Sequence, residues 1–135
     1  MTMSLVEYLG GLVFKLLGMN AERKKEVATY MASIADTLGK YGPRWRDNAP
    51  FDELRGYAAE TQDLAKRFAD ATSDVLPKQE REDHIKKLEA AFNAKDLLAK
   101  GDDAEFEEKL AFLSEVAGTF RSAAATLRAS ANKFG

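Results

Sequence analysis

The segment from residue 103 to the end of the chain constrains the fold more than any other feature of this sequence. Its apolar side chains recur at alternating steps of four and three residues without a break. This spacing places them on one face of an α-helix, and Asp102 followed by Glu105 is typical of a helix start. We therefore predict a helix over 103–133, with an apolar stripe that another surface must cover. The stripe consists of Phe106, Leu110, Leu113, Ala117, Phe120, Ala124, Leu127, Ala131 and Phe134.

Three earlier segments repeat this helical spacing and are separated by residues that interrupt helices. Asn20 is a favourable N-cap for the first of them, and the Gly-Pro pair at 42–43 predicts its end. Pro77 predicts a break after the second segment, and Gly101 predicts the end of the third. The predicted helices cover 21–41, 50–76 and 78–100.

The composition is that of one folded, soluble domain. The chain has 135 residues, of which 45% are hydrophobic and 31% are charged, and it contains only three prolines. A chain of this length fits one core and is too short for two well-buried cores. Apolar stripes of similar length can cover each other within one short chain. We therefore predict an all-α fold in a single domain over 1–135: an antiparallel up-and-down bundle of four long helices plus a short apolar N-terminal helix.

The apolar N-terminal helix, predicted over 1–18, has two interpretations. It is too short to span a bilayer and shows no secretory signal, so we expect a cytoplasmic protein. The helix either fills the core as a fifth element, with Gly10 and Gly11 at a helix crossing, or exposes apolar surface to a partner or to lipid. The candidate residues for such a contact are Leu5, Leu9, Gly10, Gly11, Leu12, Phe14 and Leu16.

A second candidate contact is the run Arg44, Trp45 and Arg46, which we place in a loop after the Gly-Pro pair. Guanidinium groups and indole rings are common at interaction sites, because both stack and the guanidinium also pairs with anions. The alternative is that Trp45 folds back and caps the end of the bundle. The near balance of 20 basic against 22 acidic side chains predicts no nucleic-acid partner.

Side chains for common catalytic and cofactor chemistry are missing from the sequence. No cysteine and one histidine exclude disulfides, thiolate catalysis and the paired Glu-x-x-His motifs of di-iron proteins. No phosphate-binding or dinucleotide-binding glycine motif occurs. We interpret His84 as a solvated imidazole and the acidic residues at 102–108 as helix-capping groups. We therefore predict no catalytic residue, no cofactor and no metal. The one enzymatic hypothesis that the sequence leaves open is a site built from buried carboxylates on facing helices.

Two helical segments are distinctive: 22–38, ERKKEVATYMASIADTL, and 113–128, LSEVAGTFRSAAATLR. Together they resemble small all-helical domains of bacterial signalling and defence proteins. The resemblance implies an accessory or effector domain that recruits another protein or a fused signalling domain. More distantly, the motif LGGLVF at 9–14 is similar to the first helix of the HeLo and bell-type bundles of regulated cell death. That similarity implies a first helix that is released to attack membranes, and Glu7 and Lys15 depart from its pattern.

These observations lead to two functional hypotheses. The first is a non-enzymatic module for protein-protein interaction or self-association in bacterial signalling or defence. Its partner is another protein, a fused signalling domain or a second copy of the chain. The second is a membrane-active effector whose residues 1–18 leave the bundle and engage lipid, so that a cytoplasmic protein becomes membrane-associated on activation.

Overall fold

The computed structural model of the protein describes residues 5–134, apart from the side chains at 94, 96 and 134, and within this range the chain is all-helical, with no strand. Residues 1–4 of the helix predicted over 1–18 lie outside the described part. The elements in chain order are α1 (Leu5–Leu16), α2 (Ala21–Arg46), α3 (Phe51–Thr72), the short 3-10 helix η1 (Ser73–Val75), α4 (Lys78–Ala91), α5 (Ala94–Leu98) and α6 (Asp103–Phe134).

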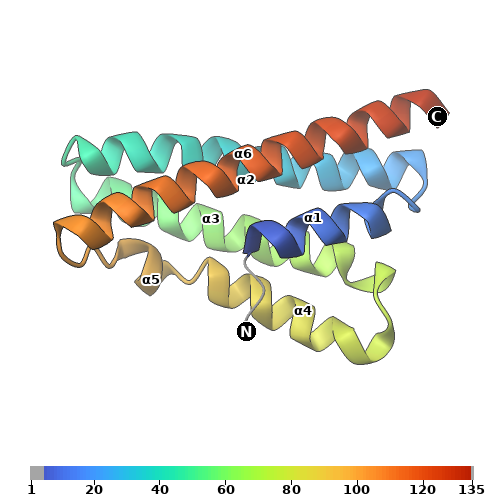
Figure 1. Ribbon diagram of the computed structural model, residues 1–135, viewed down its shortest axis with the longest axis horizontal. Coiled ribbons are helices and arrows are strands. Elements are labelled where there is room, and N and C mark those ends of the chain that lie inside the picture. The colour runs from blue at the N-terminus through green and yellow to red at the C-terminus, as the bar shows by residue number, and fades with distance from the viewer. Residues whose placement is uncertain (1–4, 135) are drawn as a thin grey trace.

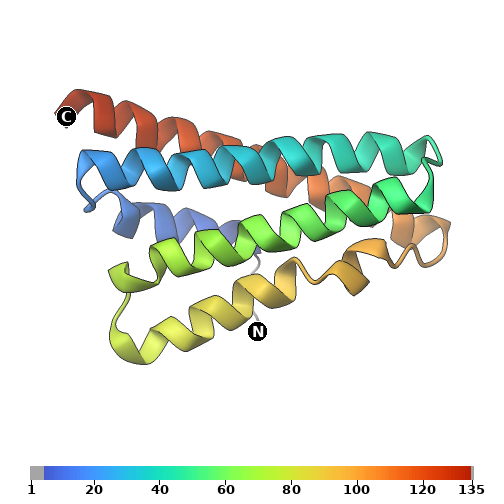
Figure 2. The same cartoon turned by 180° about the vertical axis from the view of Figure 1, so that it is seen from behind.

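Successive long helices run in opposite directions along one axis (Figure 1). α2 and α6 pack along most of their lengths and form the largest interface between helices. α3 packs on α2, and α4 and α5 lie along the far side of α3 (Figure 2). The short α1 packs on α6 and leads back into the start of α2. The core therefore lies between α2, α3 and α6, and the remaining helices close its open sides.

The apolar stripe of α6 forms the centre of this core, as its spacing predicts. The ring of Phe120 lies 5.6 Å from the ring of Phe68 on α3 and 5.9 Å from the ring of Phe92 at the end of α4. This one side chain therefore joins three helices. Phe106 is half-buried, and the side chain of Phe134 lies outside the described part. The buried members of the stripe are Leu110, Leu113, Ala117, Phe120, Ala124, Leu127 and Ala131.

The end predicted for the helix over 21–41, at the Gly-Pro pair 42–43, is wrong. α2 continues through Pro43 to Arg46. A proline inside a helix removes one backbone hydrogen bond and costs about 3 kcal/mol. Packing beyond the proline offsets this cost, because Trp45 is buried and its ring lies 5.1 Å from the ring of Tyr41. Tertiary contacts therefore override the local signal.

The helix predicted over 50–76 is shorter than expected. The α-helical part, α3, ends at Thr72, and the tighter helix η1 follows it to Val75. Leu76 then adopts an extended conformation, with φ of −102° and ψ of 152°. This is the conformation that a following proline imposes, so the break predicted at Pro77 is confirmed.

The helix predicted over 78–100 is divided into α4 and α5. Between them, the side chain of Asn93 accepts a hydrogen bond from the backbone N–H two residues later (2.9 Å). Asparagine competes with helical backbone hydrogen bonds in this way. The break lets both Phe92 and Leu97 enter the core, and the Tyr41 hydroxyl of α2 donates a hydrogen bond to the Leu97 carbonyl.

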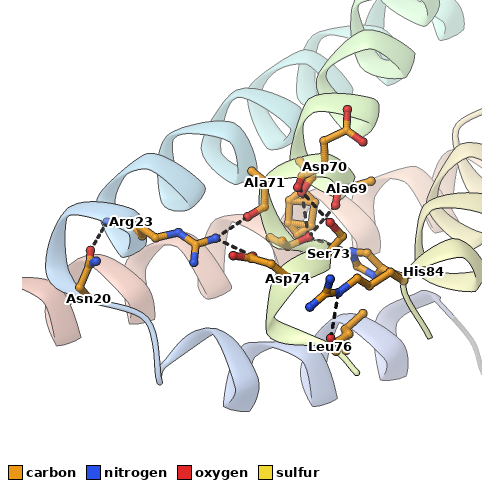
Figure 3. Close-up of polar contacts among 12 residues, drawn as sticks. Asn20, Arg23, Ala69, Asp70, Ala71, Ser73, Asp74, Leu76 and His84 are labelled. Carbon is orange, nitrogen blue, oxygen red and sulfur yellow. Dashed lines mark hydrogen bonds and ion pairs between the residues drawn. The ribbon is translucent and has the colours of Figure 1, made fainter. Parts of the chain in front are cut away.

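Side-chain caps mark the starts of the two longest helices, as predicted. The Asn20 side chain accepts the backbone N–H of Arg23 (2.9 Å), and the Asp102 side chain accepts that of Glu105 (2.8 Å). The guanidinium of Arg23 also donates to the Asp74 carboxylate (2.7 Å) and to a backbone carbonyl at the end of α3. The start of α2 is thereby tied to the far end of α3 (Figure 3).

Candidate interaction surface

One face of α1 belongs to the core. Leu5, Leu9, Leu12 and Leu16 recur at steps of four, three and four residues, and all four side chains are buried. These four candidate residues are therefore not available to a partner while α1 stays in place. The interpretation of α1 as a further core element describes this face correctly.

The opposite face of α1 is open. Phe14 is 79% exposed, which makes it the most exposed large apolar side chain of those that the structure describes. Gly10 and Gly11 are also exposed, and a Cβ atom added at either position would have no neighbouring atom within 4 Å. The expectation that these two glycines stand at a helix crossing is therefore wrong, because no other helix approaches either position closely.

A groove runs between α1 and α6 beside Phe14. It has a volume of about 530 Å³, and Val13 and Leu17 of α1 form one wall. The wall on α6 contains Gly118 and Ser122, whose small side chains keep the groove open. We call Phe14 together with this groove the α1–α6 surface. In the sequence, the signal for this groove is the run of small residues beside the apolar stripe of α6.

A buried polar cluster connects α1 to the rest of the molecule, and His84 is at its centre. His84 is only 2% exposed, so its interpretation as a solvated imidazole is wrong. Its Nε2 atom lies 2.8 Å from Oγ1 of Thr72, and its Nδ1 atom is hydrogen-bonded to the Tyr8 hydroxyl. The three residues come from α4, α3 and α1 respectively, and Figure 3 shows His84 beside the end of α3.

The hydrogen bonds of this cluster fix the tautomer of a neutral His84. The Thr72 hydroxyl donates to the carbonyl of Phe68 (2.8 Å), so it accepts a hydrogen bond from Nε2–H of His84. In the neutral imidazole Nδ1 then carries no proton and accepts the hydrogen of the Tyr8 hydroxyl. The spacing of His84 four residues before the buried Leu88 is the signal that places it on the inner face of α4.

Burial and nearby charge favour the same neutral state. Burial lowers the pKa of His84 to about 4, and the positive charges of Lys87 and Lys15 contribute to the decrease. Burial also raises the pKa of Tyr8, with a further contribution from the negative charge of Glu80. The phenol therefore keeps its proton and remains the donor to His84. We call Tyr8, Thr72 and His84 the α1 latch.

The second candidate run lies at the opposite end of α2 from α1 (Figure 1). Trp45 is 7% exposed, and its ring lies 4.9 Å from the ring of Phe106 in an edge-on contact. The indole therefore covers this end of the core, as the alternative interpretation of Trp45 describes. The structure does not bring this run together with the candidates on α1.

The two arginines that flank Trp45 already hold carboxylates. Arg44 is paired with Glu53 (2.8 Å), and Arg46 makes two hydrogen bonds of 2.9 Å to Glu107. Hydrogen bonds within each pair raise the pKa of the guanidinium and lower the pKa of the carboxyl group. All four groups lie near the surface, where such pairs contribute little to stability. The two pairs link the end of α2 to the start of α3 and to the start of α6.

In comparisons with known proteins, no protein-family model, no curated protein and no solved structure matches the chain. Within residues 5–134, no helix combines the length and the apolar character that a membrane crossing requires. Among the side chains that the structure describes, no three of His, Cys, Asp or Glu converge as a metal site would need.

Proposed function

We propose that this chain is a non-catalytic module for protein-protein interaction or self-association, acting in bacterial signalling or defence, and that the α1–α6 surface makes the contact. The alternating directions of α2, α3, α4 with α5, and α6 support its classification as an antiparallel up-and-down four-helix bundle with a short apolar N-terminal helix. The observation that carries the proposal is the exposure of Phe14, at 79%, on the edge of an open groove.

Among the residues that the structure describes, Phe14 makes no ring-ring and no cation–π contact. The other strongly exposed phenylalanine, Phe51, is 60% exposed and has the guanidinium of Arg55 at 5.8 Å from its ring centroid. Phe14 stands next to an apolar wall and small side chains, which is an arrangement that accepts an apolar group from outside. A large aromatic side chain beside a pocket is also the usual centre of a protein interface.

A photo-crosslinking experiment tests this proposal. The photoreactive residue p-benzoylphenylalanine replaces Phe14 in one version of the chain and Phe51 in a matched control, and both are irradiated in bacterial cells. We expect adducts, either to a second copy or to one other protein, from position 14 and not from position 51. Sedimentation velocity of the purified chain then shows whether the adduct is a self-association product. Equal or absent adducts at the two positions would contradict the proposal.

The alternative function, a membrane-active effector, is favoured by the way α1 is attached. The inner face of α1 packs on the core through its leucine stripe, and the hydroxyl of Tyr8 is hydrogen-bonded to His84 of α4. Breaking the hydrogen bond from Tyr8 to His84 would remove a polar contact that holds α1 to α4. Leakage of anionic vesicles should then increase in Tyr8→Phe and disappear when residues 1–18 are deleted. A folded Tyr8→Phe protein that causes no leakage would argue against this alternative.

A further inference from the structure

A second groove, on the other side of α6, has a different chemical character. It lies between α2 and α6, has a volume of about 440 Å³ and is floored by Leu38, Leu110, Leu113 and Ala117. These four side chains are buried in the core, so the floor is aliphatic and rigid. The groove stays open because Gly39 and Gly42 on α2 have no side chains to fill it.

Arg121 provides a positive charge at one end of this groove. Its guanidinium reaches across from α6 towards α2, so that a Cβ atom added at Gly39 would lie 3.7 Å from Nη2. Among residues 5–134, Arg121 has no hydrogen bond and no ion pair, whereas Arg23, Arg44, Arg46 and Arg67 each hold a carboxylate. The groove therefore presents the guanidinium of Arg121, without a hydrogen-bond acceptor, beside an aliphatic floor.

The other end of the groove repels a second negative charge. The Arg46 guanidinium that lines it is already bound to Glu107 through two hydrogen bonds. Asp47 adds a further carboxylate to the lining at this end. A ligand that places an anion at Arg121 must therefore have an uncharged remainder along the groove.

From this charge arrangement we infer that the α2–α6 groove binds a small amphiphilic monocarboxylate, with its carboxylate on Arg121 and its aliphatic chain along the floor towards Pro43. One guanidinium matches one carboxylate through two parallel hydrogen bonds. The volume lies within the range of small-molecule pockets, which are mostly apolar with a few polar groups that fix orientation. The inference does not depend on the proposed function, because the α1–α6 surface lies on a different side of α6.

Octanoate is a suitable probe, with octan-1-ol as a neutral ligand of the same chain length. Each is titrated into the full chain and followed by backbone amide chemical shifts. We expect octanoate to shift amides around Gly39 to Asp47 on α2 and Leu110 to Arg121 on α6. Octanoate should bind at least about tenfold more tightly than octan-1-ol, because a hydrogen bond to a charged group is stronger than one between neutral groups.

Two substitutions separate the contribution of the Arg121 charge to binding from that of the open groove, and each has a matched control. Arg121→Gln should weaken octanoate binding about tenfold and leave octan-1-ol unchanged, whereas Arg128→Gln, two turns further along α6 and outside the groove, should change neither. Gly42→Leu should fill the groove and abolish binding of both ligands. Gly56→Leu, at an exposed helical glycine of α3, should leave binding unchanged. Circular dichroism and thermal unfolding confirm that each variant is folded.

Several results would overturn the inference. These are equal affinities for octanoate and octan-1-ol, octanoate binding that survives Arg121→Gln, shifts centred on the α1–α6 surface, and no binding of octanoate at all. Shifts confined to the α2–α6 groove, lost in Gly42→Leu and weakened in Arg121→Gln, would support it.

Discussion

α6 and α1 both carry apolar side chains at steps of three and four residues, and both bury that stripe. The stripe of α6 runs the length of a 32-residue helix and contacts several other helices at once. α1 has 12 residues, packs mainly on α6, and makes a polar contact with α4 through Tyr8. The comparison shows that a similar local pattern produces a central helix in one place and a peripheral helix in another. Four predictions test or sharpen this difference.

The largest effect is expected from Phe120→Ala. Removing a ring that contacts both Phe68 and Phe92 leaves a cavity in the centre of the core, so the free energy of unfolding should fall by about 4 kcal/mol. Leu12→Ala in α1 should lower it by only about 2 kcal/mol, because the short helix can shift to fill the space. Urea denaturation measures both values. Equal losses would show that α1 is as central as α6.

The next largest effect concerns pH and the α1 latch. Burial lowers the pKa of His84 from 6.5 to about 4, so the unfolded chain binds a proton that the folded protein rejects between these values. This contribution to stability is complete above pH 6.5 and is lost as the pH falls to 4, by about 3 kcal/mol. His84→Gln should remove this part of the pH dependence. Urea denaturation across the window compares the two proteins, and parallel curves would contradict the assignment.

A smaller effect, of opposite sign, is expected on the open face of α1. Gly10→Ala and Gly11→Ala should each raise the free energy of unfolding by about 0.5–1 kcal/mol, because the added methyl group meets no atom and the helix gains propensity. Gly101→Ala is the control and should be destabilising, since Gly101 has a φ of +70°. Thermal unfolding gives the sign for each. Destabilisation at residue 10 or 11 would mean that another segment packs there.

The smallest effect on stability is expected from Phe14→Ser. Because this side chain is almost fully exposed, the change in the free energy of unfolding should stay below about 0.5 kcal/mol. The same variant should lose any contact made through the α1–α6 surface. Thermal unfolding and sedimentation velocity measured together separate these outcomes. A large loss of stability would place Phe14 in the core.

The sequence predicts those features of this fold that depend on nearby residues. The stripe of α6, the N-cap at Asn20 and the break at Pro77 all follow from spacing or from the chemistry of one residue, and all three are confirmed. Pro43 and Asn93 show where local rules fail. The packing of Trp45 allows α2 to continue past Pro43. The side chain of Asn93 accepts a backbone hydrogen bond and interrupts a helix that the apolar pattern alone would continue.

The candidate surface could be predicted only in part for the same reason. The sequence places Phe14 and the leucines on one apolar helix, but which face meets α6 depends on residues more than a hundred positions away. His84 lies in a charged segment, and its burial depends on Tyr8 and Thr72, which come from two other helices. The position of Arg121 beside Gly39 likewise depends on how α6 is placed against α2, which periodicity cannot reveal.

The proline within α2 gives the molecule a built-in spectroscopic reporter. Pro43 has no N–H to donate to the carbonyl one turn earlier, so the final turn of α2 lacks one backbone hydrogen bond. We expect this turn to open before the rest of the helix. The only tryptophan of the chain, Trp45, sits on this turn between the rings of Tyr41 and Phe106. Its fluorescence emission should therefore move to longer wavelength when this end of the molecule opens, ahead of the loss of helical circular dichroism.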